Sequence, residues 1–165
     1  MVPGSKLCKD EDGTAIHESY YNRIIESLMY LTSTRPDLVY SVSLISRYMA
    51  KPTEIHLQAT KRILRYLKGT FDYGIMYRKG DSTDLIAYIN SDYASDVDDR
   101  KSTSGYMFLL SSGAVSWVSK KQPIVTLLTT KVEFMAVAGC ATQVVWMRKV
   151  LQQLGREQEK SIIIM

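Results

Sequence analysis

Carboxylates are the side chains of this sequence that could hold a metal ion. The chain has two cysteines, Cys8 and Cys140, and two histidines, His17 and His56. Neither histidine has a cysteine or a second histidine at the close spacing of a zinc site, so we expect no transition-metal cluster. The wide separation of the cysteines also argues against a disulfide framework. Any metal chemistry would therefore fall to aspartate and glutamate.

A second pattern that could do chemistry is a row of basic residues. Lys61, Arg65 and Lys68 recur at i, i+4 and i+7, which puts them on one side of a helix, with Arg62 beside them. One interpretation is an ordinary solvated helix face, and the other is a surface that follows nucleic-acid phosphates. The net charge of +4 is compatible with a polyanionic partner but does not choose between them.

The composition is typical of a globular protein. With 165 residues, 45% of them hydrophobic and 23% charged, the chain can bury one moderate core or two small ones. No stretch approaches the roughly 18 uninterrupted apolar residues of a membrane helix, and the first residues lack the apolar core of a signal peptide. We therefore expect an intracellular protein with neither a membrane nor a small-molecule substrate as its partner.

The first half of the chain is expected to be helical. Helical apolar spacing runs through residues 17–33 until Pro36 interrupts it, and Pro36 can begin a second helix that Pro52 stops. Thr53 suits the N-cap of a third helix. The spacing predicts that these core positions of the second and third helices are buried: Leu38, Val42, Ile45, Met49, Ala59, Ile63 and Leu67.

Extended structure is predicted after residue 72. Residues 73–78 look extended and residues 79–82 form a turn, so we divide the chain into a helical domain (1–72), a linker or strand (73–82) and a second domain (83–165). Residues 85–89, 106–110 and 114–119 predict three antiparallel strands. A long helix is predicted next, and Gly155 ends it. Its apolar side contains Val132, Ala136, Cys140, Val144, Met147, Leu151 and Leu154. Residues 161–165 predict a buried strand. The expected fold class is α+β.

Seven short blocks resemble the Pol polyprotein of copia-type LTR retrotransposons. In the second half these are RKSTSGY (100–106), AVSW (114–117) and KKQ (120–122), which are similar to the family's ribonuclease H region. In the first half they are YNR (21–23), SLMYLT (27–32), TRPD (34–37) and RYLKGT (65–70), which are similar to the end of its reverse transcriptase. The resemblance implies a helical segment like the reverse transcriptase thumb or connection, followed by a ribonuclease H-like domain with a mixed sheet and a long helix. It also implies that the aspartates of DNA synthesis belong upstream of Met1.

The resemblance implies a site that hydrolyses the RNA strand of an RNA–DNA hybrid with two Mg²⁺ ions held by carboxylates. Glu133, within VEFMA (132–136), matches the family's helix glutamate and is the first candidate catalytic residue and metal ligand, although a glutamate there is also favourable against the helix dipole. Asn90 replaces the family's leading aspartate on the first strand, which leaves Asp92 as the nearest catalytic and metal candidate; its ordinary role would be in a turn. An amide offers one neutral oxygen, so its hold on Mg²⁺ is weaker. Lys131, where the family commonly has an acid, would oppose metal binding if it faced the site.

We expect a fragment of Pol whose ancestral roles were RNA-directed DNA synthesis and hybrid hydrolysis. Two further acidic positions of the family have no counterpart before Met165, so the second domain is expected to be truncated, and with Asn90 this predicts no hydrolysis by the chain alone. One alternative is a residual nucleic-acid-binding module that uses Lys61, Arg62, Arg65, Lys68, Lys120 and Lys121. Another is an interaction module in which residues 162–165 pair with a strand of another chain, such as the remainder of Pol. The resemblance implies assembly in the cytoplasm with access to the nucleus.

Overall fold

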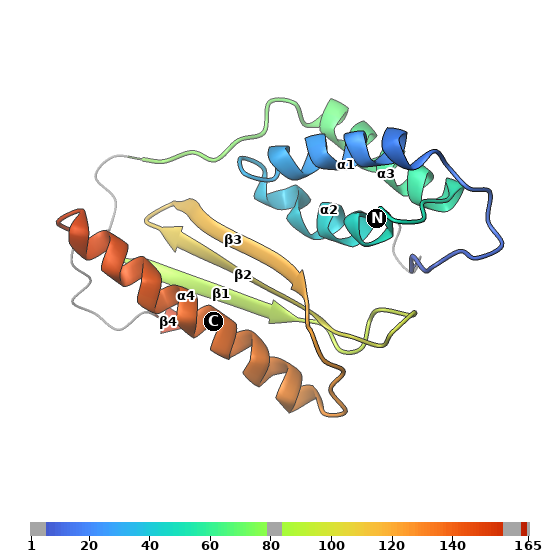
Figure 1. Ribbon diagram of the computed structural model, residues 1–165. Coiled ribbons are helices and arrows are strands. Elements are labelled where there is room, and N and C mark those ends of the chain that lie inside the picture. The colour runs from blue at the N-terminus through green and yellow to red at the C-terminus, as the bar shows by residue number, and fades with distance from the viewer. Residues whose placement is uncertain (1–5, 79–83, 157–162, 165) are drawn as a thin grey trace. The chain divides into compact units, whose positions relative to one another are not determined.

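The chain divides into two structural units. A computed structural model describes residues 6–78, 84–156 and 163–164. The first unit comprises Met1–Gly74 together with Asp96–Arg100, and the second comprises Ile75–Ser95 and Lys101–Met165. Helices make up the first unit, whereas the second is a sheet with one long helix (Figure 1). The expected α+β fold class is confirmed.

The helices of the first unit are α1 (Glu18–Leu31), α2 (Val39–Ile45) and α3 (Glu54–Gly69). Two short 3₁₀ helices, η1 (Pro36–Leu38) and η2 (Ser46–Tyr48), flank α2. The predicted second helix is therefore a chain of three short pieces rather than one continuous α-helix. Pro36 stands at the first position of η1, where its missing N–H and fixed φ are tolerated.

The predicted apolar stripes form the core of the first unit. The buried cluster contains these side chains: Tyr21, Ile25, Leu28, Leu38, Val42, Ile45, Ala59 and Ile63. Met49 and Leu67, which were also expected inside, are partly buried and pack against this cluster. Tyr21 keeps its hydroxyl satisfied within the core by donating a hydrogen bond to the carbonyl of Ile45 over 2.9 Å.

Thr53 is the N-cap of α3, as its residue type predicted. The backbone N–H of Thr53 donates to Nδ1 of His56 over 3.0 Å, which completes a capping box in which His56 takes the place usually held by glutamate or glutamine. His56 is fully buried and stacks on Tyr48, with ring centroids 4.1 Å apart. Its residue type gave no signal for this structural role.

The second unit contains a mixed sheet in the order β3-β2-β1-β4. Its elements are β1 (Leu85–Ser91), β2 (Thr103–Leu110), β3 (Gly113–Lys121), α4 (Thr129–Gln153) and β4 (Ile163–Ile164). The first three strands pair antiparallel, as predicted, and β4 pairs parallel to β1. Residues 73–78 belong to no strand. The predicted turn at 79–82 lies outside the described residues, as do residues 161, 162 and 165 of the last predicted strand.

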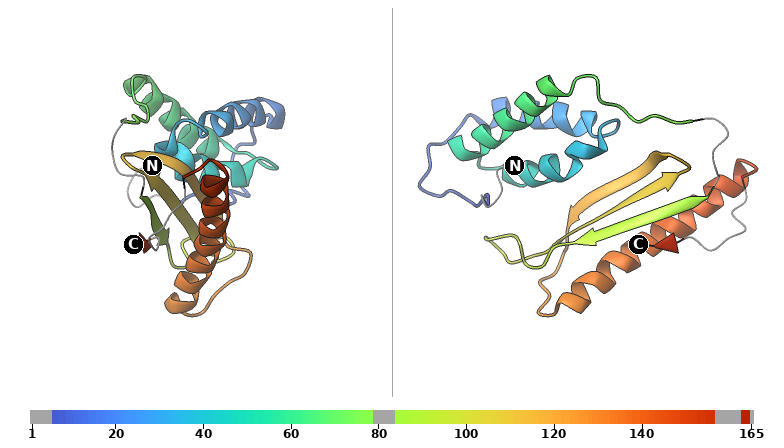
Figure 2. Two further views of the ribbon diagram at one scale, coloured as in Figure 1. Left: turned by 90° about the vertical axis from the view of Figure 1, so that its left-hand side faces the viewer. Right: turned by 180° about the vertical axis from the view of Figure 1, so that it is seen from behind.

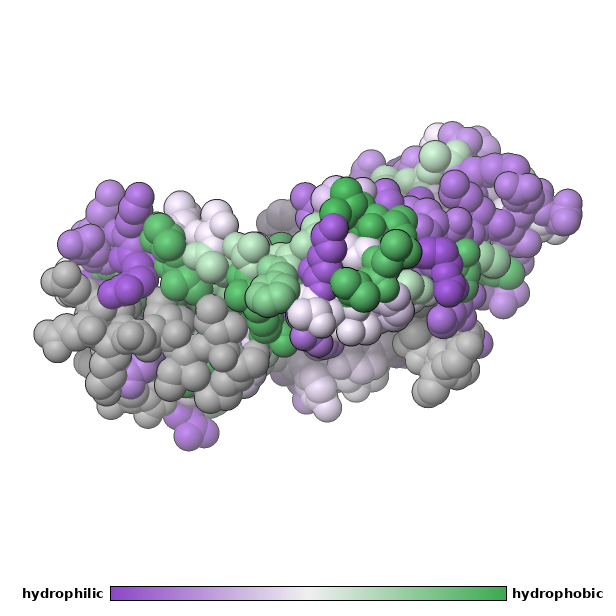
Figure 3. Space-filling model, turned by 90° about the horizontal axis from the view of Figure 1, so that it is seen from below, coloured by the Kyte–Doolittle hydropathy of each residue, from purple (hydrophilic) through white to green (hydrophobic). Residues whose placement is uncertain are grey.

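Helix α4 covers one face of this sheet (Figures 1 and 2). The core between them contains Leu85, Ala87 and Phe108 from the strands and Cys140, Met147 and Leu151 from the helix. Hydrophobic surface also gathers over α4 when the molecule is seen from below (Figure 3). Although α4 has 25 residues, no helix in the described part of the chain is both long and apolar enough to cross a membrane.

Two glycine positions explain details of the second unit. Leu154, which was expected to be buried, is 70% exposed because α4 ends at Gln153 and the chain then turns at Gly155 with a φ of 69°. Gly105 in β2 lies under the carbonyl of Val118, and a Cβ there would come within 2.9 Å of that oxygen. The glycine of the RKSTSGY block is therefore required by close backbone packing between β2 and β3.

Candidate metal and nucleic-acid sites

The first candidate position is the end of β1. Asn90 is exposed and pairs with Gly105 of β2. The strand ends at Ser91, so strand alternation does not set the direction of the Asp92 side chain. Oδ1 of Asp92 accepts the backbone N–H of Thr103 over 2.8 Å, and the N–H of Asp92 donates to the carbonyl of Thr103 over 3.0 Å. Asp92 thus closes the connection between β1 and β2, the turn role that its residue type also suggested.

The second candidate position is the beginning of α4. Glu133 is exposed in the first two turns of the helix, while its neighbour Val132 is buried against the core. Lys131 is exposed two residues before Glu133, and the first turn of α4 has no acidic side chain. The N-terminus of α4 therefore carries a cation, although the helix dipole favours an anion at that end.

Gln122 is a structural residue that sequence reasoning missed. Its side-chain amide donates to the carbonyl of Val132 over 3.1 Å and to the hydroxyl of Ser104 over 2.7 Å. It is 5% exposed, and it joins β2 to the helix turn that carries Glu133. Its place in the KKQ block was the available signal, because a glutamine between a strand and a helix can bond both to the neighbouring strand and to the helix.

The residues present do not fit a site for two Mg²⁺ ions. Among the described residues, no three His, Cys, Asp or Glu side chains come together in a way that could hold a metal. Asn90 offers a neutral oxygen, and one oxygen of Asp92 is already bonded to the backbone. Within the described part of the chain, the end of β1 therefore lacks the concentrated negative charge that Mg²⁺ requires.

The acidic residues that follow β1 in the sequence, Asp96 and Asp98, bond to groups of the first unit. Asp96 is buried, and its Oδ2 lies 3.1 Å from Nη1 of Arg47 in an ion pair. Its Oδ1 accepts the backbone N–H groups of Asp98 and Asp99 over 3.0 and 3.3 Å. Asp98 in turn accepts the N–H of Lys9 over 3.0 Å. These carboxylates hold a turn in place, as their residue type suggested.

The basic residues of α3 form an exposed row. Lys61, Arg62, Arg65 and Lys68 are all exposed on this helix. Lys61 lies 3.9 Å from the carboxylate of Glu54, an ion pair so open to water that it contributes little to stability. Lys120 and Lys121 occupy the end of β3 in the other unit, where Lys120 is exposed and Lys121 is partly buried. Because side chains alternate along a strand, these two lysines point to opposite faces of the sheet.

Two of the sequence blocks meet around Arg35. This buried guanidinium donates to both oxygens of Asp37 over 3.0 and 2.8 Å, and to the carbonyl and hydroxyl oxygens of Thr70 over 2.9 and 2.8 Å. The rings of Tyr66 and Tyr73 each lie 5.9 Å from its central carbon. Hydrogen bonding to Arg35 lowers the pKa of Asp37. The TRPD and RYLKGT blocks therefore serve the packing of α3 against η1.

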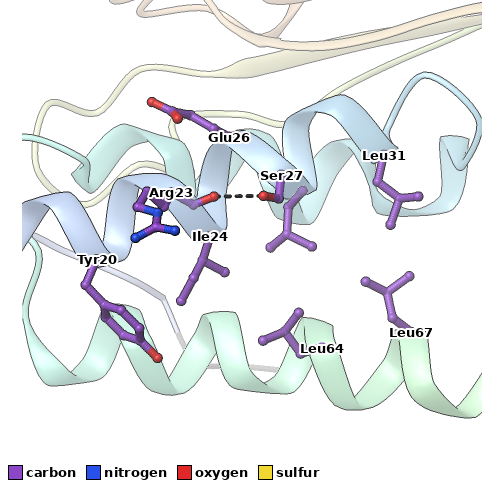
Figure 4. A pocket seen from close by; sticks show the side chains of 9 residues that line it. Tyr20, Arg23, Ile24, Glu26, Ser27, Leu31, Leu64 and Leu67 are labelled. Atoms are coloured by element: carbon purple, nitrogen blue, oxygen red, sulfur yellow. Dashed lines mark hydrogen bonds between the residues drawn. The ribbon is translucent and has the colours of Figure 1, made fainter.

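An open pocket lies between α1 and α3 of the first unit. It is a groove of about 790 Å³ (Figure 4). The residues that line it are Tyr20, Arg23, Ile24, Glu26, Ser27, Leu28, Leu31, Leu64 and Leu67. Sequence reasoning placed Leu67 of this lining at a core position, and it had no signal that two of the helices would leave space between them.

The chain resembles a short part of much longer transposon proteins. It is 43% identical over 155 residues to the retrovirus-related Pol polyprotein from transposon RE1 of Arabidopsis thaliana, a match that covers 94% of this chain and 11% of that protein. It is 39% identical over 144 residues to the corresponding polyprotein from transposon TNT 1-94 of Nicotiana tabacum, with coverages of 87% and 11%. The chain thus spans about a tenth of these polyproteins.

A shorter protein is similar over nearly its whole length. The secreted RxLR effector protein 161 of Plasmopara viticola is 42% identical over 128 residues, which cover 77% of this chain and 90% of that protein. No family model and no solved structure matches the chain. The RE1 and TNT 1-94 relatives are retrovirus-related Pol polyproteins of transposons, and this is the class to which the chain is similar. Within that class the chain belongs to the copia-type Pol family, as the sequence blocks indicated.

Proposed function

We propose that this chain is the part of a copia-type Pol in which the end of reverse transcriptase continues into a ribonuclease H-type unit, and that this unit does not hydrolyse an RNA–DNA hybrid on its own. The succession of three antiparallel strands, a helix and a strand parallel to the first supports the assignment of the second unit. DNA synthesis and hybrid hydrolysis are the roles we propose for the Pol protein as a whole.

The observation that carries the proposal is Asn90 at the end of β1. This position matches the leading aspartate of the family's site, and here it holds an amide instead of a carboxylate. Two Mg²⁺ ions bring four positive charges close together, so each missing carboxylate weakens their binding. Asp92 is a poor replacement because its carboxylate already bonds to the N–H of Thr103.

Lys131 makes a smaller contribution to the same effect. Residues two apart on a helix do not face each other, so Lys131 and Glu133 project in different directions from α4. The lysine still places a positive charge near the first turn of the helix, where an anion would be favourable. Restoring a carboxylate at position 90 should therefore strengthen metal binding more than removing the charge of Lys131.

Metal titration tests this proposal directly. Titrating the purified chain with Mg²⁺ or Mn²⁺ by calorimetry should show no site in the range below millimolar for the unaltered chain and tighter binding for Asn90→Asp. Gln152→Glu is the matched control, because it adds the same charge at an exposed position at the other end of α4. Tight binding by the unaltered chain that Glu133→Gln removes would refute the account.

A second candidate function is nucleic-acid binding through α3. The specific observation is that four exposed cations, at positions 61, 62, 65 and 68, lie within about two turns of this helix. Cations in a row exchange condensed counterions for contacts with successive phosphates, a gain in free energy that does not depend on base sequence. Lys120 and Lys121 are further candidates on the other unit. An RNA–DNA hybrid is the partner that the proposed origin of the chain favours.

A further inference from the structure

The groove between α1 and α3 has an aliphatic floor. Ile24, Leu28 and Leu31 contribute to it from α1, and Leu64 and Leu67 contribute from α3. In Figure 4, Ile24 and Leu31 point toward α3, while Leu64 and Leu67 point toward α1. Leu64 is nevertheless 41% exposed, and the ring of Tyr20 at one end of the groove is 55% exposed. The floor therefore exposes apolar surface to water, and a partner could cover this surface.

The shape of the groove suits a helix. Its lining residues on α1 extend from Tyr20 to Leu31, which is about 16 Å at the rise of an α-helix, or roughly three turns. A docked amphipathic helix presents apolar side chains at i, i+3 or i+4, and i+7 over that length. A small molecule fits less well, because such sites combine an apolar lining with several convergent polar groups, which the floor lacks.

The charges beside the groove are mainly positive. Lys61 and Lys68 lie three before and four after Leu64, so they share its side of α3. Arg65 follows Leu64 directly and projects about a quarter of a turn further around the helix. Arg23 contributes another cation from α1. Glu26 is the one acidic residue of the lining, and in Figure 4 it points away from α3. A partner with acidic residues beside its apolar stripe would match these charges.

We propose that this groove docks an acidic amphipathic helix of a partner protein. The apolar stripe of that helix covers the leucines, and its acidic flank faces the cations of α3. A nucleic-acid strand is the less suitable occupant, because an aliphatic floor offers neither hydrogen-bond donors for phosphates nor a row of aromatic rings for bases. Docking at this groove does not depend on the proposed ribonuclease H origin of the second unit.

A designed peptide tests the proposal with the full chain. The probe is a fluorescent helical peptide of about 18 residues, with leucines at i, i+4, i+7 and i+11 and glutamates on the flanks. Fluorescence anisotropy should show saturable binding that weakens about tenfold or more when lysines replace the glutamates. Leu64→Asp and the milder Leu64→Gln should also weaken binding about tenfold or more, whereas Leu154→Asp, at an exposed leucine of the other unit, should not. Circular dichroism confirms that each variant folds.

Three results would overturn the proposal. The first is equal binding of the lysine peptide or of a scrambled peptide, which would show that the groove does not recognise an acidic amphipathic helix. The second is an absence of peptide binding at millimolar concentration. The third is weaker binding of an RNA–DNA hybrid by Leu64→Asp without any peptide binding, which would make the groove a nucleic-acid site. None of these results depends on Asn90 or on metal, so failure here is distinct from failure of the proposed function.

Discussion

Nη1 of Arg35 donates a hydrogen bond of 2.9 Å to the backbone carbonyl of Thr70, 35 residues further along the chain. Thr70 is the C-cap of α3, so this bond satisfies a carbonyl at the helix end that has no partner within the helix. The same guanidinium pairs with Asp37. One buried side chain thus connects the start of η1 to the end of α3.

Replacing Arg35 should destabilise the first unit. In Arg35→Ala the carbonyl of Thr70 keeps only the N–H of Tyr73, and Asp37 loses its charged partner, at a cost of about 2–3 kcal/mol in the free energy of unfolding. Urea denaturation followed by circular dichroism measures this. Arg62→Ala is the control, since an exposed arginine of α3 should change stability by less than about 0.5 kcal/mol. Equal effects of the two substitutions would show that the hydrogen bonds of Arg35 are not stabilising.

His56 should make the stability of the first unit depend on pH. Nδ1 accepts the N–H of Thr53, and Nε2 lies 2.9 Å from the carbonyl of Cys8, so the folded structure needs the neutral ring. Burial lowers the pKa of His56, against the opposing effects of the Cys8 carbonyl, Asp10 and Asp98. A proton therefore binds the unfolded chain more readily, and stability should fall as the pH drops from about 6.5 toward the lower folded pKa.

His56→Gln tests this pH dependence. Glutamine at this position can keep the capping box but does not titrate, so its free energy of unfolding should lose the pH dependence that His56 contributes between about pH 5 and 7. His17→Gln, at an exposed histidine, should retain the slope of the unaltered chain. Parallel curves for His56→Gln and the unaltered chain would assign the pH dependence to other groups.

The turn around Asp96 should open when its carboxylate is removed. Asp96→Ala removes the carboxylate that pairs with Arg47 and releases the amides of Asp98 and Asp99, at a cost of about 3 kcal/mol. Hydrogen exchange at these two amides should then become faster, whereas Asp12→Ala, at an exposed aspartate, should leave them protected. Unchanged exchange in Asp96→Ala would mean that the carboxylate does not hold the turn.

The helices and their buried sides could largely be predicted, because apolar spacing reports directly which face of an element is covered. Val42, Ile63 and Cys140 are buried for this reason. The hydrogen bond between Arg35 and Thr70 could not be predicted, because it depends on two segments that only the folded core brings together. The same holds for the groove between α1 and α3. Asp92 is an intermediate case. Its residue type fits both a metal ligand and a turn residue, and its hydrogen bond with the N–H of Thr103 supports the turn.

Binding to an RNA–DNA hybrid should weaken with salt if the cations of α3 bind phosphates. Each substitution that removes one cation from a phosphate should make the slope of log affinity against log salt shallower by roughly 0.9. Fluorescence anisotropy with a hybrid of about 20 base pairs, over a range of NaCl concentrations, compares the unaltered chain with Arg65→Ala and Lys68→Ala. Lys51→Ala and Lys149→Ala remove exposed cations elsewhere and serve as controls. A slope that all four variants share would assign binding to overall charge rather than to α3.

The most direct measurement is hydrolysis of a labelled RNA–DNA hybrid by the purified chain with Mg²⁺ or Mn²⁺, alongside Glu133→Gln and Asn90→Asp. Because Asn90 and the bonded Asp92 leave too little charge to hold two metals, we predict no cleavage by the unaltered chain or by Glu133→Gln. Cleavage by the unaltered chain that disappears in Glu133→Gln would contradict the account, and would show that a working metal site forms around Glu133 despite the amide at Asn90.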